Sequence, residues 1–200
     1  GLPADGMVQL PKQIIKNSNL KINFNKHLKK IANKQAFFED GSCENFDKIV
    51  LALPLSEINK ITKTQLTIKY NSNITTYFAS SKKVIGKSLF LIPEKHFKIN
   101  SIQCLSNVCS SFSKKKKHLY SVSSLDVGAT EKELKLEFQK ITDIPSADIE
   151  TIKTYRIKKA LPRQAVQIED SPSMYCCGDW NMEPSIDGAI KSGRKVAEKL

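Results

Sequence analysis

The residues best placed to do chemistry lie near the C-terminal end of this chain. A short apolar run, 173–177, precedes Gly178 and Asp179, and a loop then leads to Ser185 and a segment with helical spacing. Gly178 has no side chain, so a ligand can approach its backbone closely, and the Asp179 carboxylate can accept hydrogen bonds from ligand hydroxyls. Ser185 is a favourable N-cap. The pattern predicts a strand, a loop and a helix start that could hold an electron-rich ligand, although a plain strand–helix connection would have the same pattern.

The segment after Ser185 has the spacing of a helix with one apolar face. That face consists of Ile186, Ala189, Ile190, Gly193, Ala197 and Leu200. Its small residues permit close packing, so we expect this face to lie on a sheet. The helix N-terminus carries partial positive charge and would stabilise negative charge on a bound ring.

The segment 177–197 closely resembles the C-terminal FAD motif of the flavin-containing amine oxidase family. This family includes phytoene desaturase-like and protoporphyrinogen oxidase-like enzymes. Its pattern is Gly-Asp, a loop, then Ser-x-Glu-Gly-Ala and Ser-Gly, and here Asp187 stands where Glu is usual.

Three weaker stretches agree with the family in order and spacing. Residues 47–54 resemble its strand ending in Ala-x-Pro, and residues 155–162 resemble the strand that returns past the flavin, with Ile157 where an aromatic is common. Residues 6–10 resemble its Gly-Gly-Met helix start. The resemblance therefore extends over nearly the whole chain, and its most specific part is the last quarter.

The resemblance implies FAD as the cofactor and hydride transfer from a small-molecule C–H or C–N substrate to the flavin. By the family pattern, Asp179 would contact the ribityl or pyrophosphate region. The backbone around Ile186 and Asp187 would meet the flavin pyrimidine, and the backbone near Leu28, in a β-segment at 27–31, would meet the adenine. Trp180 would lie near the flavin or in the core. The expected cofactor-binding residues are Gly178, Asp179, Trp180, Ser185, Ile186, Asp187, Gly188, Ala189 and Leu28.

The remaining elements follow from periodicity and turn residues. Residues 7–17 have helical spacing, and Thr130 with Glu133 forms a capping box before another helix, whose apolar stripe is Leu134, Phe138 and Ile141. The apolar run 46–53 favours a strand buried on both faces, as in a parallel sheet. Further strands are predicted at 20–24, 35–39, 65–70, 74–79, 88–92, 99–105, 119–124 and 149–157. Their close succession in the middle of the chain favours an antiparallel sheet.

These elements predict an α/β (α+β) fold with two domains. Residues 1–53 and 165–200 would form a partial FAD/NAD(P)-binding Rossmann-like domain. Residues 54–164 would form an inserted antiparallel-sheet domain that binds the substrate.

The glycine pattern indicates that half of a flavin site is missing. None of the eight glycines belongs to a G-x-G-x-x-G turn, which normally holds the pyrophosphate. The chain could be a piece of a longer enzyme, a split product that needs a partner chain, or a degenerate protein that no longer binds FAD. We therefore expect a missing N-terminal half or partner chain, and weak or no FAD binding by this chain alone.

The charge distribution leaves a second function open. The net charge is +12, and residues 51–117 contain twelve lysines, two glutamates and no arginine. A solvated basic face explains this surplus, as does attraction of an acidic partner or an anionic surface. Lysine without arginine argues against nucleic-acid recognition. The alternative to an oxidoreductase is a non-catalytic module derived from this fold that binds an acidic partner through its basic middle domain. We expect the run 114–117 to form an exposed hairpin loop.

The cysteines and histidines point to no disulfide framework or metal site. There are five cysteines, no C-x-x-C, and three scattered histidines. Cys176 and Cys177 are adjacent and would point to opposite faces of a strand, either as buried packing or as a redox pair. No apolar run approaches the roughly 18 residues of a bilayer span, and the polar start argues against a signal peptide. We expect reduced thiols in a cytoplasmic protein.

Overall fold

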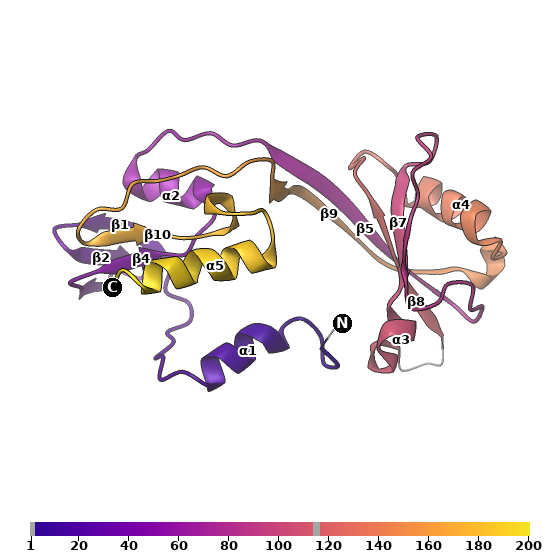
Figure 1. Cartoon of the computed structure of the whole chain (residues 1–200), viewed down its shortest axis with the longest axis horizontal. Helices are drawn as coiled ribbons and strands as arrows, with labels where there is room; N and C mark the ends of the chain where they lie inside the picture. The colour runs from indigo at the N-terminus through magenta and orange to yellow at the C-terminus, as the bar shows by residue number, and fades with distance from the viewer. Residues whose placement is uncertain (1–2, 114–116) are drawn as a thin grey trace. The chain divides into compact units, whose positions relative to one another are not determined.

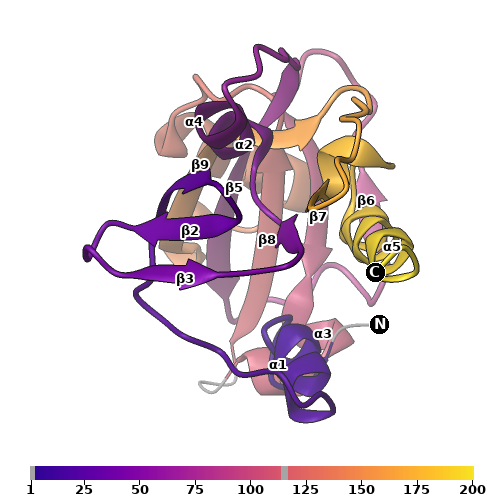
Figure 2. The same cartoon turned by 90° about the vertical axis from the view of Figure 1, so that its left-hand side faces the viewer.

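Alternating apolar residues in the middle of the chain form a five-stranded sheet in the computed structural model, which describes residues 3–113 and 117–200 (Figure 1). The strand order is β6-β7-β8-β5-β9, and the pairs β6–β7, β7–β8 and β8–β5 are antiparallel, as predicted. The strands are β5 (Tyr70–Ser80), β6 (Leu89–Leu91), β7 (Ile99–Cys104), β8 (His118–Ser124) and β9 (Glu150–Pro162). Figure 2 shows β5, β8 and β7 side by side.

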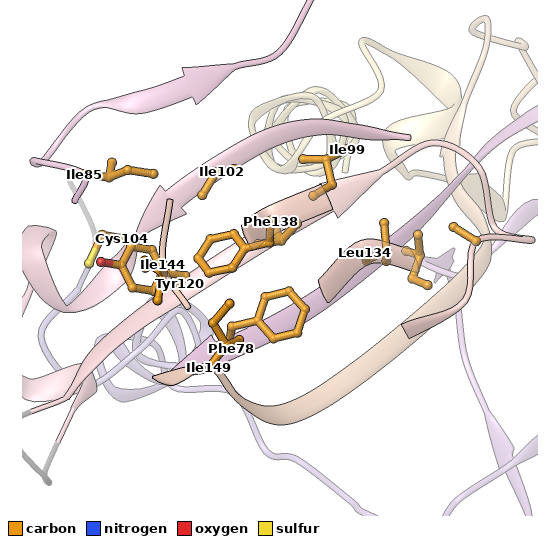
Figure 3. Close-up of a cluster of buried hydrophobic side chains, with 13 residues drawn as sticks. Phe78, Ile85, Ile99, Ile102, Cys104, Tyr120, Leu134, Phe138, Ile144 and Ile149 are labelled. Carbon is orange, nitrogen blue, oxygen red and sulfur yellow. The ribbon is translucent and has the colours of Figure 1, made fainter. Parts of the chain in front are cut away.

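One face of this sheet is covered by α4 (Glu131–Thr142). The predicted capping box is present: the Thr130 hydroxyl accepts the Glu133 N–H, and the Glu133 carboxylate accepts the Thr130 N–H at 2.7 Å. Phe138 stacks within 5.2 Å of both Phe78 and Tyr120 in the buried cluster that Figure 3 shows. The predicted stripe of Leu134 and Phe138 therefore forms the core of this part of the chain.

The five-stranded sheet belongs to the first of two compact units. Unit 1 comprises Gly1–Leu20 and Ser72–Ala160, and unit 2 comprises Lys21–Asn71 and Leu161–Leu200. The remaining elements of unit 1 are α1 (Gln9–Lys16), α3 (Leu105–Val108) and the 3-10 helices η1 (Ser110–Phe112) and η2 (Ser146–Asp148). The helix predicted at 7–17 is thus confirmed as α1. The unit boundaries differ from the predicted domain boundaries, because α1 groups with the sheet and residues 54–71 group with unit 2.

Unit 2 contains a three-stranded antiparallel sheet and a parallel strand pair. The first consists of β1 (Leu28–Ala32), β2 (Gln35–Phe38) and β3 (Cys43–Asn45). The second consists of β4 (Ile49–Leu51) and β10 (Met174–Cys176), and its parallel pairing agrees with the prediction for 46–53. The helices are α2 (Leu55–Thr62), the 3-10 helix η3 (Asp179–Asn181) and α5 (Ile186–Ala197).

Three strand predictions need correction. Residues 20–24 form no strand, and Phe24 is 80% exposed with no partner strand. Residues 65–69 are irregular; Leu66 and Ile68 alternate because they pack against the core beneath α2. The strand in 46–53 is shorter than predicted and is not buried on both faces, because Val50 is exposed. Residues 114–116 of the predicted lysine loop lie outside the described residues.

Candidate functional site

The predicted strand, loop and helix start form one continuous structure in unit 2. β10 pairs with β4 as far as Cys176, and the next residue, Cys177, donates its N–H to the Leu51 carbonyl at 3.1 Å. The chain then turns through Gly178 into η3, and α5 begins after Ser185. Eight of the nine predicted cofactor-binding residues therefore lie within one strand–loop–helix segment.

Position 178 needs glycine because the Trp180 side chain lies directly against its backbone. A Cβ at position 178 would lie 2.3 Å from Trp180 Nε1, a distance that nonbonded atoms do not adopt. The indole is 1% exposed, and its N–H donates to the Leu53 carbonyl at 3.0 Å. The Trp180 side chain thus lies in the core. Its hydrogen bond anchors the loop to Leu53, two residues after the end of β4.

Ser192 connects this loop to the middle of α5. The Gly178 N–H donates to Ser192 Oγ at 3.1 Å, and Ser192 is buried. The family motif includes this serine in its Ser-Gly pair, yet the sequence alone assigned it no role. A polar residue on the buried side of a helix is the signal that could have singled it out, because such a residue needs a hydrogen-bond partner.

The start of α5 is built by Ser185 and Gly188. Ser185 Oγ accepts the Gly188 N–H at 2.9 Å, so the predicted N-cap is confirmed. The Glu183 carbonyl crosses directly over Gly188, where an added Cβ would lie 1.8 Å from its oxygen. The N–H groups of Ile186 and Asp187 find no acceptor within residues 3–113 and 117–200. These two donors are free to bind an acceptor on a ligand.

The buried face of α5 is not the predicted one. The buried residues are Gly188, Ser192 and Val196, one helical turn apart. Gly188 lies against the Glu183 carbonyl and Ser192 against Gly178, where only small side chains fit, and Val196 packs against Tyr175 and Cys177. Ile186 and Ile190 of the predicted face are 61% and 47% exposed. Ala189, a predicted cofactor-binding residue, is also exposed. The apolar face of α5 therefore has no partner within unit 2.

The acidic residues of the site have different surroundings. Asp179 is half-buried and lies close to Tyr70, whose pKa is raised chiefly by burial and further by the Asp179 carboxylate. Tyr70, the first residue of β5, was not predicted as a site residue. The Asp187 carboxylate pairs with Lys191 at 2.8 Å one turn later.

Leu28 is distant from the strand–loop–helix segment in the sequence but packs against the same hydrophobic cluster. It opens β1, opposite Phe38, at a register irregularity between Leu28 and Lys30. Its side chain packs against the cluster that contains Trp180 and Leu51. The structure therefore places all nine predicted residues in unit 2, and their contact with a cofactor stays a prediction.

The two adjacent cysteines are buried on opposite sides of β10. Cys176 belongs to the cluster beneath α2, and Cys177 packs against Val196 of α5. Burial, followed by the charge of Asp170, raises the pKa of Cys176 to about 11. Both thiols are therefore protonated at neutral pH, which favours packing over redox chemistry. In the described part of the chain, no cluster of histidine, cysteine or carboxylate side chains could hold a metal ion.

Comparison with protein families covers the N-terminal part of this chain. Residues 1–88 match the model of the family described as flavin containing amine oxidoreductase. The predicted family resemblance is confirmed. The matched residues end before 177–197, so the roles assigned to that segment stay predictions. A search of curated proteins found no match.

Solved structures share the fold. The PF1083 protein from Pyrococcus furiosus superposes with a TM-score of 0.74 at 18% identity, over 96% of this chain and 51% of that protein. A putative protoporphyrinogen oxidase from Exiguobacterium sp. 255-15 superposes with a TM-score of 0.73 at 12% identity, over 97% and 50%. An oxidoreductase from Methanosarcina mazei superposes with a TM-score of 0.71 at 15% identity, over 97% of this chain and 54% of that protein. The chain spans about half the length of these structures and shares their mixed α/β fold.

Proposed function

We propose that this chain supplies one side of the flavin site of an FAD-dependent oxidoreductase. The observation that carries the proposal is the start of α5, where the Ile186 and Asp187 N–H groups have no acceptor in the described residues. Two parallel donors at a helix N-terminus suit a carbonyl edge that gains negative charge. The pyrimidine ring of a flavin has such an edge, so these residues fit the cofactor.

Each neighbouring residue has a role in holding that geometry. Ser185 and Gly188 fix the first turn of α5, and Ser192 holds Gly178, so that the loop and the helix move together. Asp179 is half-buried with no ion pair in the described chain and would accept hydrogen bonds from the ribityl hydroxyls. Bound FAD would supply the hydride acceptor, and this chain would supply orientation and charge stabilisation.

The apolar face of α5 supports the proposal that another polypeptide segment completes the site. Exposed Ile186 and Ile190 lie on a helix whose opposite face is fully packed. In addition, β4 and β10 form a parallel pair of two strands, whereas parallel sheets normally have more strands and both faces covered. A strand followed by G-x-G-x-x-G would extend this partial Rossmann-like sheet and bind the pyrophosphate.

The uncovered face of the five-stranded sheet is suited to line a substrate pocket. Strand residues that point away from α4 are half-buried and mostly neutral: Thr75, Tyr77, Ser101, Gln103, Ser121 and Ser123. Tyr77 meets Tyr155 edge to face with 6.0 Å between ring centroids. We assign this face, within the predicted substrate domain, to the binding of a small-molecule substrate.

Flavin content tests the proposal. We would purify this chain alone and joined to the segment encoded immediately before it, and measure the ratio of flavin to protein by absorbance. The chain alone should carry little flavin, and the longer polypeptide should carry one flavin per chain. Absence of flavin from a folded longer polypeptide that contains G-x-G-x-x-G would refute the proposal and favour the non-catalytic interaction module. A stoichiometric flavin in this chain alone would refute the requirement for a second half.

A further inference from the structure

The segment 82–91 of unit 1 exposes an unusual run of apolar side chains. Leu89, Phe90 and Leu91 make up β6 and are 54%, 52% and 68% exposed, and nearby Val84 is 46% exposed. β6 is the outermost strand of its sheet in the described chain, and it is apolar on both faces. Single exposed apolar residues are ordinary, whereas three in succession on a sheet edge indicate an interaction surface.

Cations flank these apolar side chains. Lys82, Lys83 and Lys87 are exposed, and none of them forms an ion pair with a described residue. No carboxylate occurs between residues 81 and 93. The proposed flavin site makes no use of these lysines, so they are available to a second interaction of unit 1.

Hydrogen bonds from Tyr120 and Asn107 anchor the first part of the segment, residues 82–85, to the rest of unit 1. The Tyr120 hydroxyl donates to the Lys82 carbonyl at 2.6 Å and accepts the Val84 N–H at 3.2 Å. The Asn107 side chain donates to the Ile85 carbonyl, and the Ile85 side chain enters the buried cluster of Figure 3. A surface preorganised in this way loses little conformational entropy on binding.

We propose that the segment 82–91 binds the surface of an anionic phospholipid bilayer. A nucleic acid or a purely acidic polypeptide would use the lysines and leave Leu89, Phe90 and Leu91 in water. A bilayer with anionic headgroups takes both parts, because apolar side chains enter the boundary between headgroups and acyl chains while lysines remain among the phosphates. The proposed contact needs no membrane-spanning helix, and none is found among the described residues.

Vesicle co-sedimentation tests the charge requirement. The chain should bind vesicles of phosphatidylcholine with phosphatidylserine far better than vesicles of phosphatidylcholine alone. Each lysine contributes about 1 kcal/mol near an anionic surface, so the triple variant K82Q/K83Q/K87Q should bind on the order of a hundredfold more weakly. The control variant K132Q/K140Q/K158Q removes three exposed lysines elsewhere on unit 1 and should bind far better than the first. Equal losses in the two triple variants would overturn the proposal.

A second set of variants tests the apolar insertion. Leu89→Ser with Leu91→Ser should weaken vesicle binding, whereas Leu136→Ser, at a position 47% exposed on α4, should not. Phe90→Trp should show a blue shift of the added emission on vesicles, while buried Trp180 gives a constant background. No binding to anionic vesicles, or binding without the blue shift, would refute the membrane assignment. Binding to polyglutamate or RNA as strong as to vesicles, without that shift, would favour a purely electrostatic partner. Circular dichroism would establish that each variant is folded.

Discussion

Replacing Gly188 by alanine should destabilise unit 2, whereas the same replacement at Gly193 in the same helix should stabilise it. A Cβ at position 188 would lie 1.8 Å from the Glu183 carbonyl oxygen and 2.8 Å from its carbon, so backbone must move. A Cβ at position 193 meets nothing within 4 Å. The two substitutions are chemically identical, so the difference between them reports only the local crowding.

The magnitudes follow from the balance of two effects. Overpacking a rigid site costs about 3 kcal/mol, and alanine recovers about 1 kcal/mol of helix propensity, so Gly188→Ala should destabilise by roughly 2 kcal/mol. Gly193→Ala gains the propensity alone, roughly 0.5–1 kcal/mol. For a unit of this size, these changes correspond to about 10 °C downward and about 4 °C upward in Tm.

Trp180 provides the assay. It is the only tryptophan, and it is buried in unit 2, so its fluorescence follows the unfolding of this unit selectively. Urea titrations of the two variants and the wild type would give the free energies of unfolding. If Gly188→Ala were as stable as Gly193→Ala, the close passage of the Glu183 carbonyl over the helix would be wrong.

Three further predictions concern other contacts. Ser192→Ala should destabilise unit 2 by about 1–3 kcal/mol in the same titration, because the Gly178 N–H loses its buried acceptor; an unchanged midpoint would contradict that role. The hydrogen bond from Lys98 lowers the pKa of Glu133 from 4.5 to about 2, so its contribution to stability should be complete above pH 4.5 and lost as the pH falls toward 2. In Glu133→Gln the free energy of unfolding should no longer fall between pH 4.5 and pH 2 on account of this residue. A variant with the same pH profile as the wild type would contradict the role of Glu133. A thiol reagent should modify the exposed Cys43 in the native chain and should reach three thiols only on unfolding: Cys104, Cys176 and Cys177.

The sequence predicted most of the elements that depend on local patterns. The capping box at Thr130 and the N-cap at Ser185 formed as expected, because each needs only residues within one helical turn. The alternating strands of the middle sheet were also found, since period-two patterns with one apolar face are characteristic of a half-buried antiparallel sheet. These features require no knowledge of distant partners.

The failures depend on partners that a local pattern does not show. Residues 65–69 have the alternation of a strand, but Leu66 and Ile68 pack against a helix-covered core with no strand beside them. The apolar stripe of α5 looked like its packing face, yet the bulk of Ile186 and Ile190 cannot fit where Gly188 touches the Glu183 carbonyl. The role of Ser192 depends on a hydrogen bond to Gly178, which only the folded loop brings near.

The most direct test of the half-site is an amide NMR titration of this chain with FAD and, in parallel, with ADP, which lacks the flavin ring. Millimolar FAD should shift the amide resonances of Ile186 and Asp187 and those near Leu28, whereas ADP should shift only those near Leu28. FAD that leaves the Ile186 and Asp187 amides unmoved, or shifts them no more than ADP does, would contradict the assignment of the α5 N-terminus to the flavin ring.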